Sequence, residues 1–257
     1  KPDYVERYER DRDWWEMHHR YTIQQVVKLL SDNSHPGSKK EPPKVLDVGS
    51  GPGIFLDVAR ANGFQTFGIE PCNEVAELSR QRGHQVWTGV LEGQPRQYDV
   101  VNAYEVLEHV PDPEGFLDTC RSSLVPGGVL CVTVPNDYNL LQLEAQKRLG
   151  LKEWWLAPPE HLNYFEPKSL QLMVRRVGFK VQDIRTTFPL ERFLLEGMNY
   201  IGNDEVGREI HAARKHYEYI EMRLGKWEKL METYRDQCSD PYSGTIGREI
   251  VLIATKE

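Results

Sequence analysis

The segment VLDVGSGPG, residues 45–53, places three glycines between a short apolar run and a helix-like stretch. The run KVLDVG at 44–49 predicts a buried strand, and FLDVARANG at 55–63 predicts a helix that ends at glycine. Glycine allows the positive φ of a tight turn and lets a ligand approach the main chain, while the first turn of the helix offers free amide groups. The segment therefore predicts a strand, a turn and a helix with a ligand site at the turn.

Strand and helix patterns alternate along the chain as far as residue 135. Further strands are expected at 66–70, 85–89, 98–104 and 127–135, and further helices at 73–83 and 113–124. A helix at 167–177 and two strands, at 179–187 and 247–256, are expected after them. This alternation is typical of a parallel sheet that is covered by helices on both faces.

We assign residues 44–187 and 247–257 to one α/β core and residues 1–43 to a helical cap with a connecting loop. Apolar residues recur on one helix face near the N-terminus, which predicts a helix over 8–30. The segment 31–43 is polar, contains glycine and ends in two prolines, so we expect it to be a loop.

Two segments, 136–166 and 188–246, interrupt the alternation. The first lacks clear periodicity, and we expect a loop that contacts the substrate. The second is too long for a plain loop. Within it, apolar residues recur at alternating spacings of four and three: Val206, Ile210, Ala213, Tyr217, Ile220, Leu224, Trp227, Met231 and Tyr234. This heptad pattern predicts a long helix over 206–234, broken or kinked at Gly207 or Gly225, that packs against the N-terminal helix or against a second copy in a homodimer.

Two acidic residues accompany the glycine turn. Glu70 ends the next strand, about twenty residues beyond the glycines, where a carboxylate can accept hydrogen bonds from both ribose hydroxyls. Asp47 precedes the glycines, where it is poorly placed against a pyrophosphate but well placed for a cationic amino group. The dinucleotide fingerprint also requires glycine where this chain has Ile54. A nucleoside-containing ligand is therefore favoured, and a nicotinamide-dependent oxidoreductase is a weaker alternative.

The motif DVGSGPG, Glu70, the strand region YDVVNAYEVLEHV and the turn LVPGG resemble class I S-adenosylmethionine-dependent methyltransferases over residues 44–135. The resemblance implies a Rossmann-like α/β fold with seven strands, mostly parallel, whose last strand is antiparallel. It also implies S-adenosylmethionine as the methyl donor and S-adenosylhomocysteine as the product. The donor-binding residues that it implies are Asp47, Gly49, Ser50, Gly51, Gly53, Glu70, Pro71, Cys72, Val90, Leu91, Tyr104, Glu105 and His109.

The resemblance also implies roles for these residues. Asp47 and the glycines would hold the methionine part of the donor, and Glu70 would hold the ribose. The residues flanking the adenine would be Pro71, Cys72, Val90 and Leu91, although simple core packing is an alternative for Cys72, Val90 and Leu91. Tyr104 and Glu105 would line the floor near the sulfonium. His109 would contact the donor or have a structural role.

The string PEHLNYFEPKSL, residues 159–170, resembles the histidine-bearing segment of small-molecule and sugar methyltransferases. Methyl transfer mainly requires alignment and exclusion of water, but a hydroxyl acceptor benefits from a base. We therefore expect His161 to be the catalytic base, with ordering of the loop as its alternative role. Oxygen and nitrogen ligands could also meet near the strand ends, but their spacing is not that of a metal motif, so we expect no metal site.

The balance of 32 Lys+Arg against 39 Asp+Glu, a net charge of −7, argues against nucleic acid as a partner. No stretch approaches the roughly 20 apolar residues that span a bilayer, and the charged start does not resemble a secretory signal. The four cysteines form no C-x-x-C pair, which fits a reducing compartment. We expect a cytoplasmic enzyme, without a membrane partner, that methylates a hydroxyl of a sugar or secondary metabolite. A donor-binding protein without turnover is a further alternative.

Overall fold

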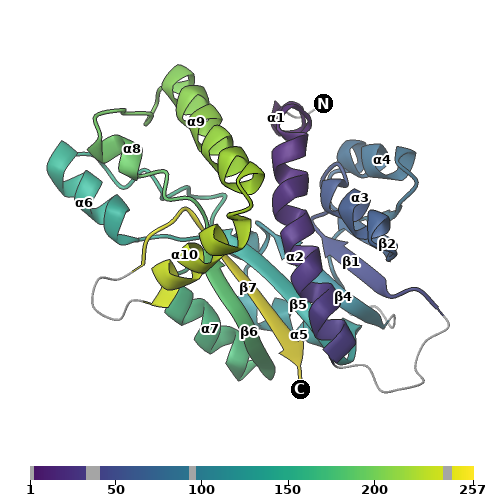
Figure 1. The fold of residues 1–257 in the computed structure, drawn as a ribbon. Helices are drawn as coiled ribbons and strands as arrows, with labels where there is room; N and C mark the ends of the chain where they lie inside the picture. The colour runs from purple at the N-terminus through teal and green to yellow at the C-terminus, as the bar shows by residue number, and fades with distance from the viewer. Residues whose placement is uncertain (1–2, 33–40, 93–96, 240–244) are drawn as a thin grey trace.

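The fold is built around one seven-stranded sheet, whose order is β3-β2-β1-β4-β5-β7-β6 (Figure 1). The computed structural model describes residues 3–32, 41–92, 97–239 and 245–257. The strands are β1 Lys44–Val48, β2 Gln65–Glu70, β3 Gln85–Thr88, β4 Tyr98–Tyr104, β5 Leu124–Pro135, β6 Phe179–Thr186 and β7 Glu249–Lys256. Strand β7 runs antiparallel to both neighbours, and the other pairs are parallel. The expected Rossmann-like α/β class, with an antiparallel last strand, is confirmed.

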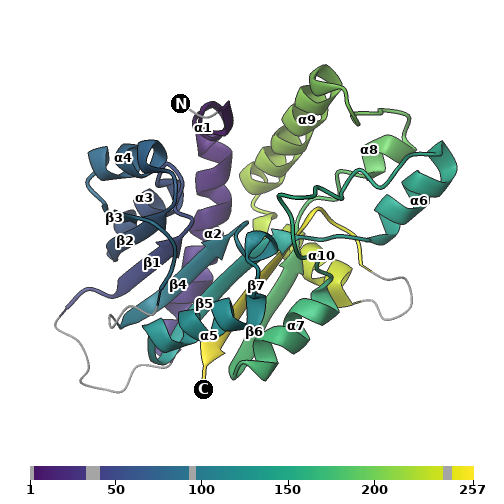
Figure 2. The ribbon, with the colours of Figure 1, turned by 180° about the vertical axis from the view of Figure 1, so that it is seen from behind.

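Helices cover both faces of this sheet. On one face lie α5 (Pro113–Ser123) and α7 (Pro167–Arg176), which Figure 2 shows in front of the strands. On the other lie α2 (Arg12–Asp32), α3 (Ile54–Ala61) and α10 (Trp227–Ser239). The remaining helices of the described chain are α1 Asp3–Arg10, α4 Asn73–Gln81, the short η1 Leu107–His109, α6 Leu140–Leu149, α8 Arg192–Leu195 and α9 Asp204–Arg223.

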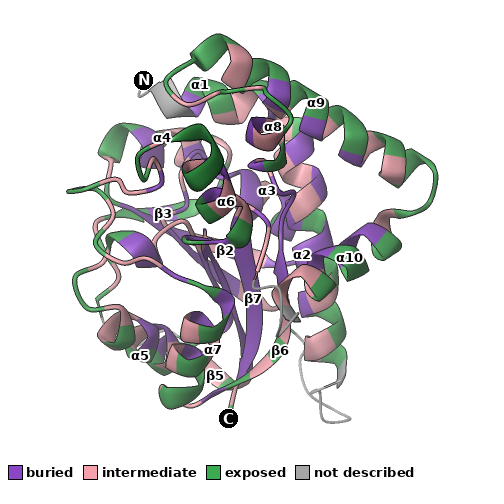
Figure 3. Ribbon diagram, turned by 90° about the vertical axis from the view of Figure 1, so that its left-hand side faces the viewer, coloured by how far each residue is buried: buried purple, intermediate pink, exposed green. Residues whose placement is uncertain are grey.

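The inner strands supply side chains to both layers of the core, because successive residues of a strand point to opposite faces. Leu46 and Leu130 belong to the cluster under α5 and α7, whereas Val45 and Val129 belong to the cluster under α2 and α3. All four side chains are fully buried, and Figure 3 shows the strands buried along most of their length. Burial on both faces explains why these strands read as continuous apolar runs.

The prediction of a plain loop over 136–166 is wrong in part, because α6 lies within it. The helix begins with a reciprocal cap: the Asn139 side chain accepts hydrogen bonds from the amides of Leu141 and Gln142, and the Gln142 side chain accepts one from the Asn139 amide. The pattern Asn-x-x-Gln is a capping-box signal for the start of a helix, although the residues after it show no clear helical periodicity. Most of the rest of this segment is irregular.

The helix expected over 206–234 is present as two helices, and the break lies at Gly225, one of the two positions at which a break or kink was expected. The chain forms α9 and α10, with a break at Gly225, whose φ of 70° lies in the left-handed region that favours glycine. Gly207 stays inside α9 without a break. The two helices place the heptad residues differently. Helix α10 packs on β6, whereas Tyr217 and Ile220 of α9, and Leu224 just after it, remain exposed.

The expected N-terminal helix is present as α1 and α2, which join at Asp11. It contacts α9 through polar groups, since Asp11 accepts a hydrogen bond from Lys215 and Trp14 donates one to Glu218. It also packs against heptad residues of α10, because Tyr21 of α2 shares a buried apolar cluster with Met231 and Tyr234. Of the expected loop at 31–43, residues 33–40 lie outside the described part of the chain. Among the described helices, none has the length and apolar character needed to cross a bilayer.

Candidate active site

A cavity of about 970 Å³ opens at the carboxyl edge of the parallel strands. Most of the predicted site residues line it: Asp47, Gly49, Ser50, Gly51, Glu70, Pro71, Val90, Leu91, Tyr104, Glu105, His109 and His161. Gly53 and Cys72 do not. The fold therefore brings together the ends of β1, β2 and β4 with the segment after α6, although these are far apart in sequence.

The glycine turn forms one wall of this cavity. Gly51 has a φ of 51°, and a Cβ atom built on it would meet no atom within 4 Å, so the main chain faces open space at this point. Gly53 lies behind the wall as the residue before α3, where a side chain would collide with Ser79. Gly53 thus closes the turn against α4 rather than offering itself to a ligand. Ser50 lies in the wall with a buried hydroxyl that packs against Gly68.

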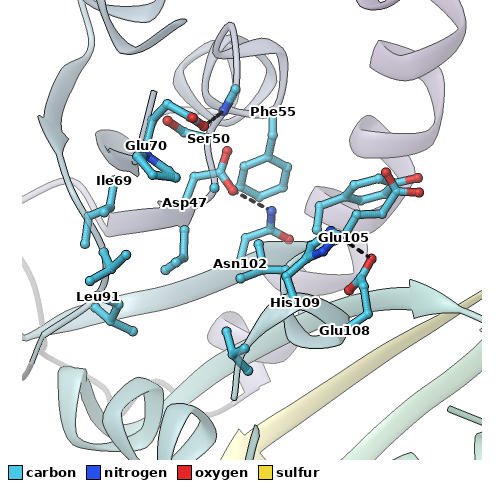
Figure 4. Close-up of a pocket in the computed structure, with 18 of the residues that line it drawn as sticks. Asp47, Ser50, Phe55, Ile69, Glu70, Leu91, Asn102, Glu105, Glu108 and His109 are labelled. Atoms are coloured by element: carbon cyan, nitrogen blue, oxygen red, sulfur yellow. Dashed lines mark hydrogen bonds and ion pairs between the residues drawn. The ribbon is translucent and has the colours of Figure 1, made fainter. Parts of the chain in front are cut away.

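Glu70 is held by two main-chain amides. Its Oε2 accepts a hydrogen bond from Gly51 N at 3.0 Å (Figure 4). Its Oε1 accepts one from Cys72 N at 3.0 Å. Each carboxylate oxygen retains a lone pair that can accept a second hydrogen bond. The carboxylate is therefore fixed in position and still able to bind two hydroxyls, and Cys72 contributes its amide rather than its thiol.

Asp47 is buried at the end of β1, only 3% exposed, and lies beside Asn102 of β4 (Figure 4). Asn102 Nδ2 donates a hydrogen bond to Asp47 Oδ1 at 2.7 Å. Burial, together with the charge of Glu70, raises the pKa of Asp47 to about 7 despite this hydrogen bond. Among the described residues Asp47 has no ion-pair partner, so a cationic group of a ligand would supply the missing charge.

His161 lines the same cavity as the glycine turn, and its ring lies beside that of His109. Its Nδ1 is buried without a hydrogen-bond partner among the described residues. Burial lowers the pKa of His161, and so do the neighbouring charges of His109 and Arg248. A neutral imidazole with a free nitrogen is the form that a general base requires.

His109 and Glu108 stand next to His161. The His109 ring donates from Nδ1 to the Glu160 carbonyl oxygen at 2.7 Å, and its Nε2 lies 3.9 Å from Glu108 Oε1 (Figure 4). Burial and nearby acids raise the pKa of Glu108 to about 8. One ligand atom from each of Glu108, His109 and His161 lies within 4.8 Å of the others, a spacing that a divalent cation could bridge. The expectation of no metal site stays untested, so assays need metal as a variable.

The cavity also contains residues that sequence analysis did not single out: Arg7 and Tyr8 of α1, Asn102 of β4, and Arg248 and Glu249 at the start of β7. Because β7 is antiparallel, its first residues lie at the same edge as the last residues of the parallel strands. Strand direction could therefore have identified Arg248 and Glu249. Asn102 was signalled as a polar residue inside an apolar strand, but no pattern in the sequence indicates Arg7 or Tyr8.

Three comparisons with known proteins all identify methyltransferases as similar to this chain. Residues 14–184 match the family described as a methyltransferase domain. The ubiquinone biosynthesis O-methyltransferase of Acinetobacter baylyi is 26% identical over 189 residues, which cover 66% of this chain and 78% of that protein. The enzyme of the same name from Pseudomonas aeruginosa strain LESB58 is 31% identical over 157 residues, covering 55% of this chain and 66% of that protein.

A similar solved structure is that of a SAM-dependent methyltransferase from Archaeoglobus fulgidus. It has a TM-score of 0.61 and 18% sequence identity, and the match covers 99% of this chain and 100% of that one. At this identity the likeness concerns the fold alone.

Proposed function

The chain belongs to the S-adenosylmethionine-dependent methyltransferases, and we propose that it methylates a hydroxyl group of a small molecule of the sugar or secondary-metabolite type. One observation carries the proposal: the carboxylates suited to the donor and a histidine suited as a base line the same cavity. The named activity of the O-methyltransferase relatives supports an oxygen acceptor. Their low identity leaves the acceptor itself to experiment.

The residues of the cavity fit S-adenosylmethionine. Glu70 has one free lone pair on each oxygen for the two ribose hydroxyls. Asp47 is a buried carboxylate with no cationic partner in the described part of the chain, so it suits the amino group. Gly51 leaves open space where the donor can approach the main chain. The same features do not suit a dinucleotide, because Asp47 would repel a pyrophosphate and position 54 is isoleucine.

When bound, S-adenosylmethionine supplies a methyl group on a positively charged sulfur, which leaves as a neutral thioether. The protein has to orient the two reactants and exclude water from them. Tyr8 and Arg7 of α1 line the cavity, so the N-terminal helix shields it. The position of α1 is fixed from both sides, by an ion pair of Glu9 with Arg82 and, just after the helix, by Asp11 with Lys215.

His161 accepts the proton of the acceptor hydroxyl in this proposal. Its lowered pKa favours the neutral ring, which can accept a proton, although its Nδ1 is closed to solvent and the ring would have to act through its other nitrogen. The segment that carries it is fixed by hydrogen bonds from the amides of Leu162 and Asn163 to the Glu108 carbonyl oxygen, at 2.8 and 3.1 Å. The base is therefore held against the end of η1, at the edge where the acceptor enters.

The donor site is tested by calorimetry with S-adenosylmethionine, S-adenosylhomocysteine and NADH in separate titrations. We expect binding of the first two and none of NADH. Glu70→Ala removes two charge-assisted hydrogen bonds, so the affinity should fall by ~10-fold or more. Glu74→Ala, at an exposed glutamate of α4, is the matched control and should bind as the wild type does. Binding of NADH alone would overturn the assignment.

The acceptor is sought by mass spectrometry with hydroxyl-bearing sugars, phenols and amines, each assayed with EDTA and with Mg²⁺. Loss of the base in His161→Ala should lower kcat by ~100-fold or more while donor affinity stays unchanged. His216→Ala, at an exposed histidine of α9, serves as the control. Methylation of amines but of no hydroxyl compound would refute the oxygen acceptor, and an unchanged kcat in His161→Ala would remove the base.

A further inference from the structure

A second pair of carboxylates, Glu105 and Glu249, lies at the floor of the cavity apart from Asp47 and Glu70. Glu105 follows β4 and Glu249 begins β7, so two strands of opposite direction bring them to one edge. Glu105 has a φ of 53°, in the left-handed region that residues other than glycine rarely adopt. The fold holds this carboxylate at the cavity in spite of the backbone cost, a pattern found at functional sites.

The immediate surroundings of the pair are polar and only partly compensate its charge. The Tyr8 hydroxyl hydrogen-bonds to Glu105, and the Tyr104 hydroxyl donates to Glu249 Oε2 at 3.2 Å. Burial and the charge of Glu249 raise the pKa of Glu105 to about 7, although Arg248 and Arg214 act in the opposite direction. Arg248 is itself engaged with Glu191, whose Oε1 lies 3.3 Å from its Nη1.

Negative groups also dominate the cavity as a whole. The carboxyl side chains that line it are Asp47, Glu70, Glu105, Glu108, Glu160 and Glu249, and the guanidinium groups are those of Arg7 and Arg248. Glu70 suits the ribose, and Asp47 suits the amino group. Both of these groups are present in the donor and in the product. Glu105 and Glu249 have no such role, and they line the same cavity as the donor residues and His161.

We propose that Glu105 and Glu249 make the site selective for the charge on the donor sulfur, so that it binds S-adenosylmethionine more tightly than S-adenosylhomocysteine. The proposal deepens the donor site proposed above and rests on it. The two molecules differ only in the methyl group and in one positive charge. When the methyl group leaves, the carbon–sulfur electron pair stays on sulfur and the acceptor proton passes to His161. The sulfur is then neutral, so the carboxylates of Glu105 and Glu249 no longer attract it, and the product is released.

The test is calorimetry on the full chain in EDTA and without any acceptor. In the wild type we expect S-adenosylmethionine to bind ~10-fold more tightly than S-adenosylhomocysteine, because a charge near carboxylates in a partly buried site is attracted strongly. Glu105→Gln and Glu249→Gln should each weaken binding of the charged donor and leave that of the neutral product unchanged, which brings the ratio toward one. Retained binding of the product also shows that each variant is folded.

Asp47→Asn is the matched control, because it removes a carboxylate of the same cavity that faces a group common to both molecules. It should weaken the binding of both by the same factor and leave the ratio unchanged. A ratio near one in the wild type, or an unchanged ratio in both glutamine variants, would refute the proposal. Absence of binding by either molecule would overturn the donor site as well. Failure to find an acceptor leaves this test unaffected, because no acceptor takes part.

The wild type alone offers a second measurement that does not depend on any variant. Lowering the pH from about 8 to about 6 removes negative charge from Glu105 and from its neighbour Glu108 in the same cavity, so the preference for the charged donor should shrink as the pH falls. The contribution of Asp47 cancels in the ratio. The charged or titratable groups that face Glu105 are Tyr8 of α1, Tyr104 of β4, Glu108 of η1, Arg214 of α9, and Arg248 and Glu249 at the start of β7. A preference that is constant over this range would count against the proposal.

Discussion

At the scale of single residues, Asp47 determines how donor binding responds to pH. Its pKa in the free protein is raised to about 7, and only the ionised form attracts an ammonium group. The affinity for S-adenosylhomocysteine should therefore be constant above this value and fall by up to ~10-fold per pH unit below it. Calorimetry between about pH 5.5 and about pH 8.5 checks this expectation. Asp47→Asn should bind weakly and without this pH dependence, and a steep dependence retained in the variant would exclude Asp47 as its source.

Glu108 links the site to the stability of the fold. Its carboxyl is 1% exposed, and its pKa is raised from 4.5 to about 8 by burial and by neighbouring acids. The unfolded chain ionises at lower pH than the folded protein, so the free energy of unfolding should decrease as the pH rises between these values.

Glu108→Gln removes this ionisation. At about pH 8 the variant should have a higher Tm than the wild type, by ~2–4 °C for each kcal/mol of folding free energy that it recovers. Near pH 4 the two proteins should have the same Tm. Differential scanning calorimetry at both pH values measures the difference. Glu114→Gln, at a glutamate near the exposed start of α5, provides the comparison. An equal gain at both pH values would mean that packing, not charge, is responsible.

At the scale of helices, one buried carboxylate joins α2, α9 and α10. Glu218 is fully buried and accepts hydrogen bonds from Trp14 Nε1 at 2.5 Å and from the Tyr234 hydroxyl at 2.9 Å, with His18 Nε2 at 3.1 Å. Burial opposes its ionisation, but His18, Arg214 and these hydrogen bonds lower its pKa to about 2. Its stabilising effect is present above the unfolded value of 4.5 and is lost as the pH falls toward 2.

Glu218→Ala should therefore destabilise the protein by ~3–5 kcal/mol at neutral pH, because partners on α2 and α10 lose their acceptor on α9. Urea unfolding measures the loss, and limited proteolysis should show earlier cleavage in α1 and α2. Glu209→Ala changes an exposed glutamate on the same helix and should have little effect. An N-terminal segment that stays protected in Glu218→Ala would show that other contacts hold it.

The helices also show where sequence patterns are sufficient and where they are not. Gly225 lies just after α9 in the left-handed region, where its amide and that of Lys226 hydrogen-bond to carbonyl groups of the last helical turn. Gly207 lies inside α9 and does not interrupt it. Both glycines look the same in the sequence. The heptad residues Tyr217, Ile220 and Leu224 are exposed, since the fold pairs α9 with α2 through charged side chains instead. A homodimer through these exposed residues stays a prediction, which light scattering can test.

At the scale of the whole molecule, the sheet explains which parts of the site could be predicted. Asp47 and Glu70 lie at the ends of β1 and β2, and Glu105 follows β4, so the alternation in the sequence was enough to place them at one edge. Tyr8 and Glu249 come from opposite ends of the chain. Their arrival at the same cavity depends on how α1 packs and on the direction of β7, and local residue patterns contain neither fact.

Because the site draws on both ends of the chain, the donor should stabilise the molecule as a whole. A ligand that binds only the folded state at about 100 times its Kd adds ~2.7 kcal/mol, which corresponds to a rise in Tm of roughly 5–10 °C for a chain of this size. Thermal unfolding with S-adenosylhomocysteine should show this rise, whereas NADH should leave Tm unchanged. Hydrogen exchange should slow in α1 as well as in the glycine turn, since Tyr8 and Gly51 line the same cavity. Protection confined to the glycine turn would show that α1 does not close on the donor. The bound acceptor, and not α1, would then have to shield the donor from water.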